Sequence, residues 1–276
     1  MVEQTKLVYL REVLGKLLLN NVKVWLIALI YWTIGYSSSF AQSPVQVVVL
    51  DPGHGGKDRG CMGPTGVKEK NMNLKLALAV GRKIKEQFPD VKVYYTRTSD
   101  HFVELYERGE IANRHKADLF ISIHCNANPS RVPYGTETFV MGLHKSDDNL
   151  EVAKRENGSI LQEEGYKKNY KGFDPNSPLA YIMLTNYQNA FLASSLSFAT
   201  KVEREFKRYA DRLSRGVKQA GFIVLWKTTM PSVLVEVGFL SNRKEEKFLD
   251  SEEGQDKISE SIVRAFAKYK EEMDSQ

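Results

Sequence analysis

The chain has 276 residues, of which 42% are hydrophobic and 26% charged; this composition supplies a folded core and excludes a disordered protein. The formal net charge is +5, but the charges are mixed and no basic block is interleaved with aromatic residues, so we predict no nucleic-acid partner. Only two cysteines are present, Cys61 and Cys125. They exclude a disulfide framework and are expected either as buried thiols or as a single bridge.

Residues 1–41 differ from the rest of the chain. Basic residues lead into an uncharged stretch of 13 residues, Val24 to Tyr36, and then into small residues that end at Ala41. This order is typical of a secretory signal, and the apolar stretch is short for a membrane-spanning helix. We therefore predict a signal peptide at 1–41, cleaved after Ala41, and a domain at 42–276 that is exported across the inner membrane to the periplasm. The alternative is an uncleaved N-terminal membrane anchor.

The hydrophobic pattern after residue 42 predicts strands and helices in alternation. The expected strands are 45–50, 91–95, 119–123, 135–140, 222–226 and 232–237, and the expected helices are 71–88, 102–116, 186–213 and 258–269. Such alternation is typical of a single α/β domain, with a mostly parallel twisted sheet covered by helices on both faces. Residues 142–185 are charged and turn-rich, and we predict that they form a helical and loop excursion from the sheet.

Two histidines stand where buried strands end. His54 lies in a glycine-rich loop after the first predicted strand, and His124 follows the strand at 119–123. Alone, either histidine would more often be structural. The carboxyl ends of parallel strands meet at one edge of a sheet, and neutral imidazole is a common zinc ligand. Together the two histidines indicate a metal centre.

A carboxylate, Glu236, lies in the apolar run Val233–Phe239. Because an unpaired carboxylate is costly to bury, we expect it to meet a cation, a metal or a hydrogen-bond donor, or to line a cleft. The alternative is a solvent-facing position on an edge strand. If Glu236 serves as a base, the metal needs a further protein ligand, and spacing leaves Asp51, Asp58 and Glu69 as candidates.

Several motifs, taken in chain order, carry a family resemblance: Asp51–Gly56, Glu69–Lys70, Thr96–Arg97 with Asp100, Ser122–Ala127, and Val235–Asn242. Between Val47 and Tyr269 the chain resembles the zinc-dependent N-acetylmuramoyl-L-alanine amidases of bacterial cell walls, a family that includes the cell-division amidases. The resemblance implies one Zn²⁺ per chain, held by His54, Glu69 and His124, with Glu236 as the catalytic carboxylate.

The implied reaction is hydrolysis of the amide between N-acetylmuramic acid and the L-alanine of the peptidoglycan stem peptide, in wall remodelling or daughter-cell separation. The metal site itself would suit a zinc peptidase or deacetylase equally well, and a catalytically silent wall-binding regulator is a third alternative. Cys61 and Cys125 depart from the small residues that are usual in the family. Four further polar residues are candidates for orienting a ligand or contacting substrate: Asp51, Arg97, Arg108 and Asn126. For the two arginines a structural salt bridge is an equal alternative.

In cell-division members of this family, a helix in the excursion can cover the zinc until an activator protein displaces it. Residues 148–165 are helix-compatible, so the resemblance implies that 142–185 is a regulatory insertion. Its acidic candidates for blocking the metal are Glu151, Glu156, Glu163 and Glu164. An ordinary solvated acidic helix is the alternative.

Overall fold

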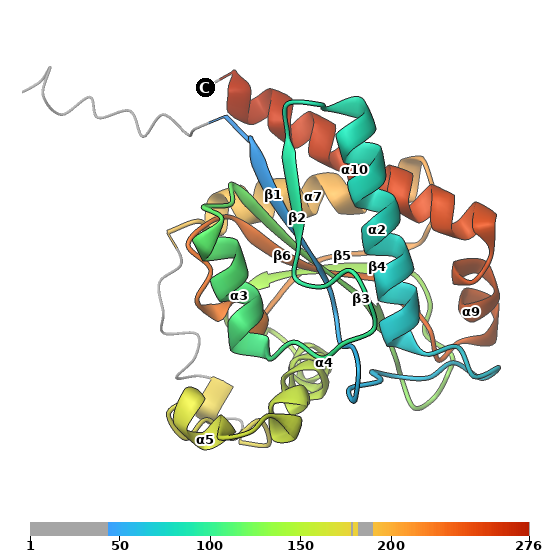
Figure 1. The fold of residues 1–276 in the computed structure, drawn as a ribbon. Coiled ribbons are helices and arrows are strands. Elements are labelled where there is room, and N and C mark those ends of the chain that lie inside the picture. The colour runs from blue at the N-terminus through green and yellow to red at the C-terminus, as the bar shows by residue number, and fades with distance from the viewer. Residues whose placement is uncertain (1–43, 178, 182–189, 276) are drawn as a thin grey trace, which may run out of the picture. The chain divides into compact units, whose positions relative to one another are not determined.

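A six-stranded sheet lies at the centre of the structure, a computed structural model that describes residues 44–177, 179–181 and 190–275 (Figure 1). The strands are β1 (Val47–Pro52), β2 (Lys92–Tyr95), β3 (Leu119–Asn126), β4 (Thr136–Met141), β5 (Ser214–Ala220) and β6 (Ser232–Phe239). Their order is β2-β1-β3-β6-β4-β5. Strands β2, β1, β3 and β6 are parallel to one another. Strand β4 pairs with β6 in antiparallel orientation and with β5 in parallel orientation. The predicted mostly parallel sheet is confirmed.

Helices cover both faces of this sheet (Figure 1). They are α2 (Glu69–Gln87), α3 (Leu105–Arg114), α4 (Asp147–Asn157), α5 (Tyr166–Asn169), α7 (Leu192–Arg208), α8 (Ile223–Trp226), α9 (Arg243–Leu249) and α10 (Glu252–Asp274), with a 3₁₀ helix, η1 (Gly158–Gln162), after α4. Val48 and Leu50 of β1 join the core formed with α2, α7 and α10, while Val49 joins the core on the other face, formed with α3, α4 and α8. This division explains the unbroken hydrophobic run of β1, since a strand covered on both faces has no polar side.

The strand predicted at 222–226 is wrong, because Ile223–Trp226 forms the short helix α8. The side chain of Asn157 accepts a hydrogen bond from Ile223 N at 2.9 Å and donates one to Gly221 O at 2.7 Å, which fixes the start of this turn. A short apolar run suits a buried strand and a buried helical turn equally well, so periodicity cannot separate them.

Strand β5 was not predicted. Among the described strands it lies at an edge of the sheet and pairs with β4 alone. Its sequence, SRGVKQA, is polar, and most of its residues are half-buried. An edge strand with so few apolar residues shows no hydrophobic alternation. The helix predicted at 186–213 ends earlier, at Arg208, and its residues 186–189 lie outside the described part of the chain.

The predicted excursion at 142–185 leaves the sheet after β4 and contains α4, η1 and α5. Residues 178 and 182–185 of it are outside the described ranges. In the view of Figure 1, α4 lies beneath the ends of the central strands, next to the loop that follows β1. The excursion therefore reaches the edge of the sheet at which the predicted site residues gather.

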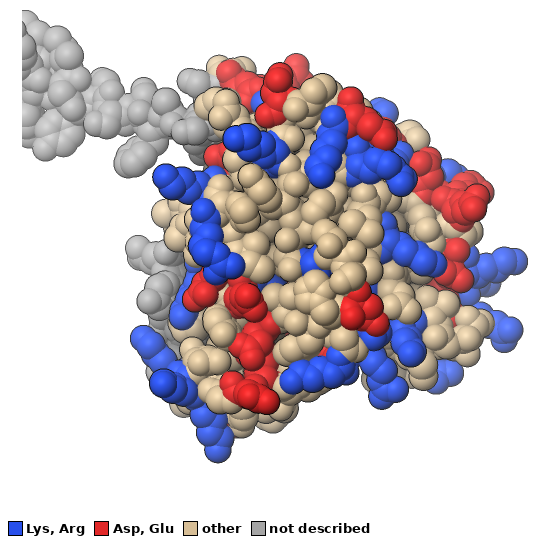
Figure 2. Space-filling model, in the orientation of Figure 1, with Lys and Arg blue, Asp and Glu red and all other residues tan. Residues whose placement is uncertain are grey.

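The predicted signal peptide at 1–41 lies outside the described residues. Within the described ranges, no helix is both long and apolar enough to cross a membrane. On the face seen in Figure 2, Lys and Arg side chains are interspersed with Asp and Glu side chains.

Candidate metal centre

Four buried side chains from four separate segments converge at the carboxyl edge of the sheet. His54 lies in the loop after β1, Glu69 is the first residue of α2, His124 lies on β3, and Glu156 lies on α4. One potential ligand atom from each lies within 4.8 Å of the other three. The structure thus brings together the three residues that the resemblance implied as ligands, and adds a carboxylate from the excursion.

The potential ligand atoms are close together without being bonded to each other. His54 Nε2 lies 3.0 Å from Glu69 Oε1 and 3.2 Å from Glu156 Oε2, and His124 Nδ1 lies 3.3 Å and 3.0 Å from the same two atoms. Nevertheless, His54 Nε2, His124 Nδ1 and Glu156 Oε2 are buried and make no hydrogen bond within the described chain. Because buried polar atoms normally have partners, atoms that converge unbonded on one point fit the coordination of a cation.

The backbone of His54 is held in a sparsely populated conformation. Its φ is +60°, a value that is uncommon for a residue other than glycine and that persists where neighbours hold it. Arg108 Nη2 donates to His54 O at 2.8 Å, and His54 Nδ1 lies 2.7 Å from Asp58 Oδ2. With Nδ1 bonded to a carboxylate, the Nε2 atom of the ring is left to face the centre.

Two glycines allow the backbone to approach the site. A Cβ atom on Gly53 would collide with the imidazole of His124, and one on Gly60 would lie 2.6 Å from both Glu69 Oε2 and His54 Cδ2. The glycine-rich sequence around His54 is therefore a packing requirement of the site.

The Glu69 carboxylate is fixed by backbone amides on both of its oxygens. Cys61 N donates to Oε2 at 2.8 Å, and Cys125 N donates to Oε1 at 3.0 Å. Asn73 adds a side-chain hydrogen bond to Oε1 at 3.3 Å. Both cysteines are free thiols in the structure, and their main chains hold this carboxylate in position.

The hydrogen bonds that the Asp51 carboxylate makes within the described residues go to groups other than the two imidazoles. The carboxylate accepts hydrogen bonds from Arg108 Nη1 at 2.8 Å, Thr96 Oγ1 at 2.5 Å and Ser122 Oγ at 2.6 Å. Asp58 is the carboxylate that contacts a candidate ligand, through Nδ1 of His54. The sequence had offered Asp58 only as one of three alternative metal ligands.

The two candidate arginines donate hydrogen bonds to the backbone of the loop that carries His54. Arg97 is 2% exposed and donates to four backbone carbonyls, including those of Pro52 and Gly53. Arg108 is 1% exposed and, besides Asp51, bonds to the carbonyls of Val103, Pro52 and His54. With these donors engaged inside the fold, both side chains hold the loop in position.

Glu236 lies on β6, directly opposite His124 of β3 in the sheet register. The carboxylate is fully buried on a central strand, which excludes the solvent-facing edge alternative. Burial, together with the nearby Glu156 carboxylate, raises the pKa of Glu236 to about 8. One of its oxygens, Oε1, receives a hydrogen bond from Arg155 Nη2 at 3.4 Å, whereas Oε2 has no hydrogen-bond partner among the described residues.

The four acidic candidates of the excursion have different surroundings. Glu156 is in the cluster, whereas Glu163 is buried elsewhere and accepts from Tyr170 Oη at 2.6 Å and Leu105 N at 2.7 Å. Glu151 is exposed and pairs with Lys154, and Glu164 is exposed. Only Glu156 of these four is positioned to meet a cation at the histidines.

Arg155, which sequence reasoning did not single out, joins the excursion to the site. It donates to Glu156 Oε1 through Nε at 2.9 Å, to Ala127 O through Nη1 at 2.9 Å, and to Glu236 through Nη2. Nothing in the sequence around Arg155 marks it, because one arginine in a charged helix is ordinary.

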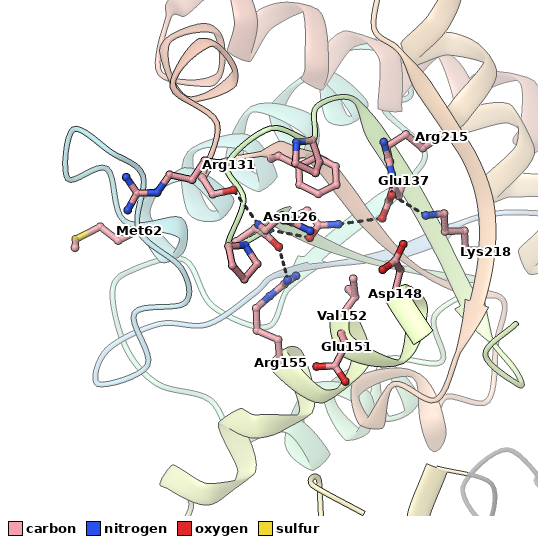
Figure 3. A pocket seen from close by; sticks show the side chains of 16 residues that line it. Met62, Asn126, Arg131, Glu137, Asp148, Glu151, Val152, Arg155, Arg215 and Lys218 are labelled. Carbon is pink, nitrogen blue, oxygen red and sulfur yellow. Dashed lines mark hydrogen bonds and ion pairs between the residues drawn. The ribbon is translucent and has the colours of Figure 1, made fainter. Parts of the chain in front are cut away.

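A cleft of about 550 Å³ opens beside the cluster (Figure 3). It is bounded by α4 on one side and by the ends of β4, β5 and β6 on another, and Asn126 and Arg155 lie in its wall. Asn126 donates through Nδ2 to Glu137 Oε2 at 2.9 Å. Arg155, in the cleft wall, bonds to the buried Glu236 carboxylate, so the cleft adjoins the residues around Glu236.

The fold and the site together place the chain among α/β proteins with a buried cluster of side chains that could hold a metal ion. More narrowly, it belongs to the Amidase_3 family of N-acetylmuramoyl-L-alanine amidases, whose family pattern matches residues 48–268. It is 32% identical over 231 residues to the amidase AmiA of Escherichia coli K12, covering 84% of this chain and 78% of AmiA. It is 34% identical over 225 residues to AmiC of E. coli O6:H1, covering 81% of this chain but only 52% of AmiC. The chain thus spans about half the length of that second relative.

Solved structures show the same fold. The N-acetylmuramoyl-L-alanine amidase from Clostridium difficile 630 superposes with a TM-score of 0.62 at 28% identity, covering 82% of this chain and 97% of that one. The CwlD amidase from Clostridioides difficile, solved in complex with the GerS lipoprotein, gives a TM-score of 0.59 at 26% identity, with 81% and 98% covered.

Proposed function

We propose that this protein is a zinc-dependent amidase that hydrolyses the amide between N-acetylmuramic acid and the L-alanine of the peptidoglycan stem peptide. One observation carries the proposal: the unbonded ligand atoms of His54 and His124 converge with the Glu69 carboxylate next to Glu236. Two imidazoles and a carboxylate form a donor set that suits a single catalytic Zn²⁺. Membership of the amidase family supports the choice of bond.

The side chains have distinct tasks in this proposal. Bound zinc would supply Lewis-acid chemistry, lowering the pKa of water and polarising the scissile carbonyl. Glu236 would take a proton from water and pass it to the leaving nitrogen, since its Oε2 has no hydrogen-bond partner among the described residues. Asp58 would keep the His54 imidazole oriented through Nδ1.

We further propose that residues 142–185 are a regulatory insertion and that α4 holds the site in an inactive arrangement. Catalytic zinc sites combine three protein ligands with an open position. Glu156 would be a fourth protein ligand, and Arg155 pairs with the Glu236 carboxylate at the same time. An activator protein that displaces α4 would free both groups. The structure of the related CwlD in complex with a lipoprotein supports a protein partner.

The proposed setting is the periplasm, with residues 1–41 as a cleaved signal peptide and the activity used in wall remodelling or daughter-cell separation. The apolar stretch from Val24 to Tyr36 supports export. Sequencing the N-terminus of the exported protein tests this part of the proposal. A chain that begins at Gln42 supports cleavage, and a chain that begins at Met1 supports the anchor.

Metal depletion and restoration test the enzymatic proposal. The full chain is treated with a chelator, assayed on purified peptidoglycan for released stem peptides, and assayed again after Zn²⁺ is added back. We expect activity to disappear and then return with about one zinc bound per chain. Activity that persists in the metal-free protein would contradict the proposal.

A further inference from the structure

The cleft contains a cationic side chain, Arg215, that does not contact the metal cluster; it lies beside Glu137 and Lys218 (Figure 3). The floor of the cleft is Glu137 of β4, which lies opposite Glu236 of β6 in the antiparallel register. Directly opposed residues of neighbouring strands project from the same face of the sheet. Glu137 therefore lies on the Glu236 face of the sheet, one strand further along, and it is bonded to Arg215 and Lys218 of β5, the next strand.

Glu137 is 3% exposed and holds three donors. Its Oε1 accepts from Arg215 Nε at 2.6 Å and from Lys218 Nζ at 2.7 Å, and its Oε2 accepts from Asn126 Nδ2 at 2.9 Å. A buried carboxylate with three donors is well satisfied. Two cations share this one carboxylate, so the cluster keeps a positive charge at the wall of the cleft.

Arg215 is held so that one edge of its guanidinium remains available. Its Nε is bound by Glu137, and its guanidinium carbon lies 5.3 Å from the centre of the Phe239 ring. The side chain is 34% exposed and lines the cleft. Within the described residues, its two terminal nitrogens have no hydrogen-bond partner. Because Nε is bonded to Glu137, the guanidinium plane is fixed, and its two terminal nitrogens present a planar pair of N–H donors. Such a pair matches the two oxygens of a carboxylate.

We propose that Arg215 is a specificity-determining residue that binds the free α-carboxylate of the residue following L-alanine in the stem peptide. This inference rests on the proposed amidase function. Strand β5 lies two strand spacings from β6, about 10 Å away, and an extended peptide advances about 3.5 Å per residue. A carboxylate one residue beyond the L-alanine therefore falls within the reach of the arginine side chain when the scissile amide is at Glu236.

Lys218 and Glu137 serve this contact as positioning residues. Lys218 adds positive charge next to Arg215, and its ammonium group is bonded to Glu137. Glu137 fixes the direction of the Arg215 guanidinium by accepting the hydrogen bond from Nε. The geometry points to a site that distinguishes a carboxylate from the isosteric carboxamide at that position, since the carboxamide brings neither the negative charge nor a second acceptor.

The experiment compares two substrates that differ in this group alone: N-acetylmuramoyl tripeptides with L-alanine, γ-linked D-glutamate and L-lysine, with either a free α-carboxylate or an α-carboxamide on the D-glutamate. The readout is the ratio of kcat/KM for the two, which does not depend on the fraction of enzyme that α4 holds inactive. We expect the unmodified chain to favour the carboxylate by about tenfold or more. Arg215→Gln should reduce the ratio to about one, mainly through a higher KM for the carboxylate.

Arg243→Gln, an exposed arginine outside the cleft, is the matched control and should keep the full ratio. Arg215→Lys retains the charge without the planar pair of donors and should give an intermediate ratio; it also replaces Arg215→Gln if that variant does not fold. If the unmodified chain hydrolyses both substrates with equal kcat/KM, or if Arg215→Gln keeps the preference, the inference is overturned while the proposed function stands. If the folded, zinc-loaded Glu156→Ala variant hydrolyses neither substrate, both the proposed function and the inference fail.

Discussion

Glu156 Oε2 lies 3.0 Å from His124 Nδ1, although the two residues come from the excursion and from a central strand. Neighbouring contacts hold α4 in this position. Ser159 Oγ donates to Asp58 Oδ2 at 2.6 Å, and Lys57 donates to Gln162 O. The excursion is thus attached to the loop that carries His54 as well as to the cluster itself.

Replacing Glu156 should activate the enzyme. Glu156→Ala removes the fourth carboxylate and leaves the three proposed zinc ligands, so we expect peptidoglycan hydrolysis to rise on the order of tenfold or more, without loss of zinc. The measurement is the rate of peptide release together with the zinc content. Glu151→Ala, on the same helix but exposed, is the control and should change neither. An unchanged rate in folded, zinc-loaded Glu156→Ala would count against a regulatory α4.

Replacing Asp58 should weaken zinc binding. Its carboxylate lies 2.7 Å from His54 Nδ1, and loss of such a partner typically reduces metal affinity by about 10- to 100-fold. Zinc affinity of Asp58→Ala can be measured by competition with a chelator of known affinity. Asp256→Ala removes a carboxylate from an exposed ion pair with Lys83 and should leave the affinity unchanged. Equal affinities for both variants would show that Asp58 does not orient a ligand.

The buried ion pair below the His54 loop should be important for stability. Arg108→Ala leaves the fully buried Asp51 carboxylate without its cation and should lower the free energy of unfolding by about 3–5 kcal/mol. On the same helix, Arg114 forms an exposed pair with Glu110, so Arg114→Ala should cost less than about 0.5 kcal/mol. Denaturant unfolding of both variants provides the comparison. A small effect for Arg108→Ala would mean that the loop does not depend on this pair.

The site residues that could be predicted from the sequence are those that lie within buried strands or directly after them. His54 and His124 follow buried parallel strands, and Glu236 interrupts an apolar one, so their meeting follows from the sheet topology. Glu69 is different. A carboxylate between two lysines is more typical of a solvated surface charge, and only the family resemblance favoured Glu69 over Asp51 and Asp58 as the further ligand. Its burial results from packing of the first turn of α2 against the glycine loop.

The excursion was the least predictable part of the chain. Four glutamates were equal candidates, and the choice of Glu156 depends on how α4 is rotated against the sheet, which local composition does not encode. Arg155 was missed for the same reason. The error at α8 arose because a short apolar run has no periodicity that separates a strand from a helical turn. Strand β5 was missed because a polar edge strand shows no alternation of hydrophobic and polar residues.

Glu236→Gln should separate chemistry from metal binding. The substitution keeps the shape of the buried side chain but removes its capacity to take a proton, so we expect hydrolysis to fall about 100- to 10,000-fold while zinc content is kept. His124→Ala should lose both zinc and activity. Retained hydrolysis in Glu236→Gln would require another residue to carry the proton.

Product analysis of purified sacculi digested by the Glu156→Ala protein with Zn²⁺ tests the central claim most directly. Mass spectrometry should find free stem peptides that begin at L-alanine, together with glycan strands of unchanged length whose muramic acid carries a free lactyl carboxylate. A zinc peptidase would instead leave shortened peptides on the glycan, and a deacetylase would leave free amino sugars. Either of these products, or no product from folded and zinc-loaded protein, would contradict the account.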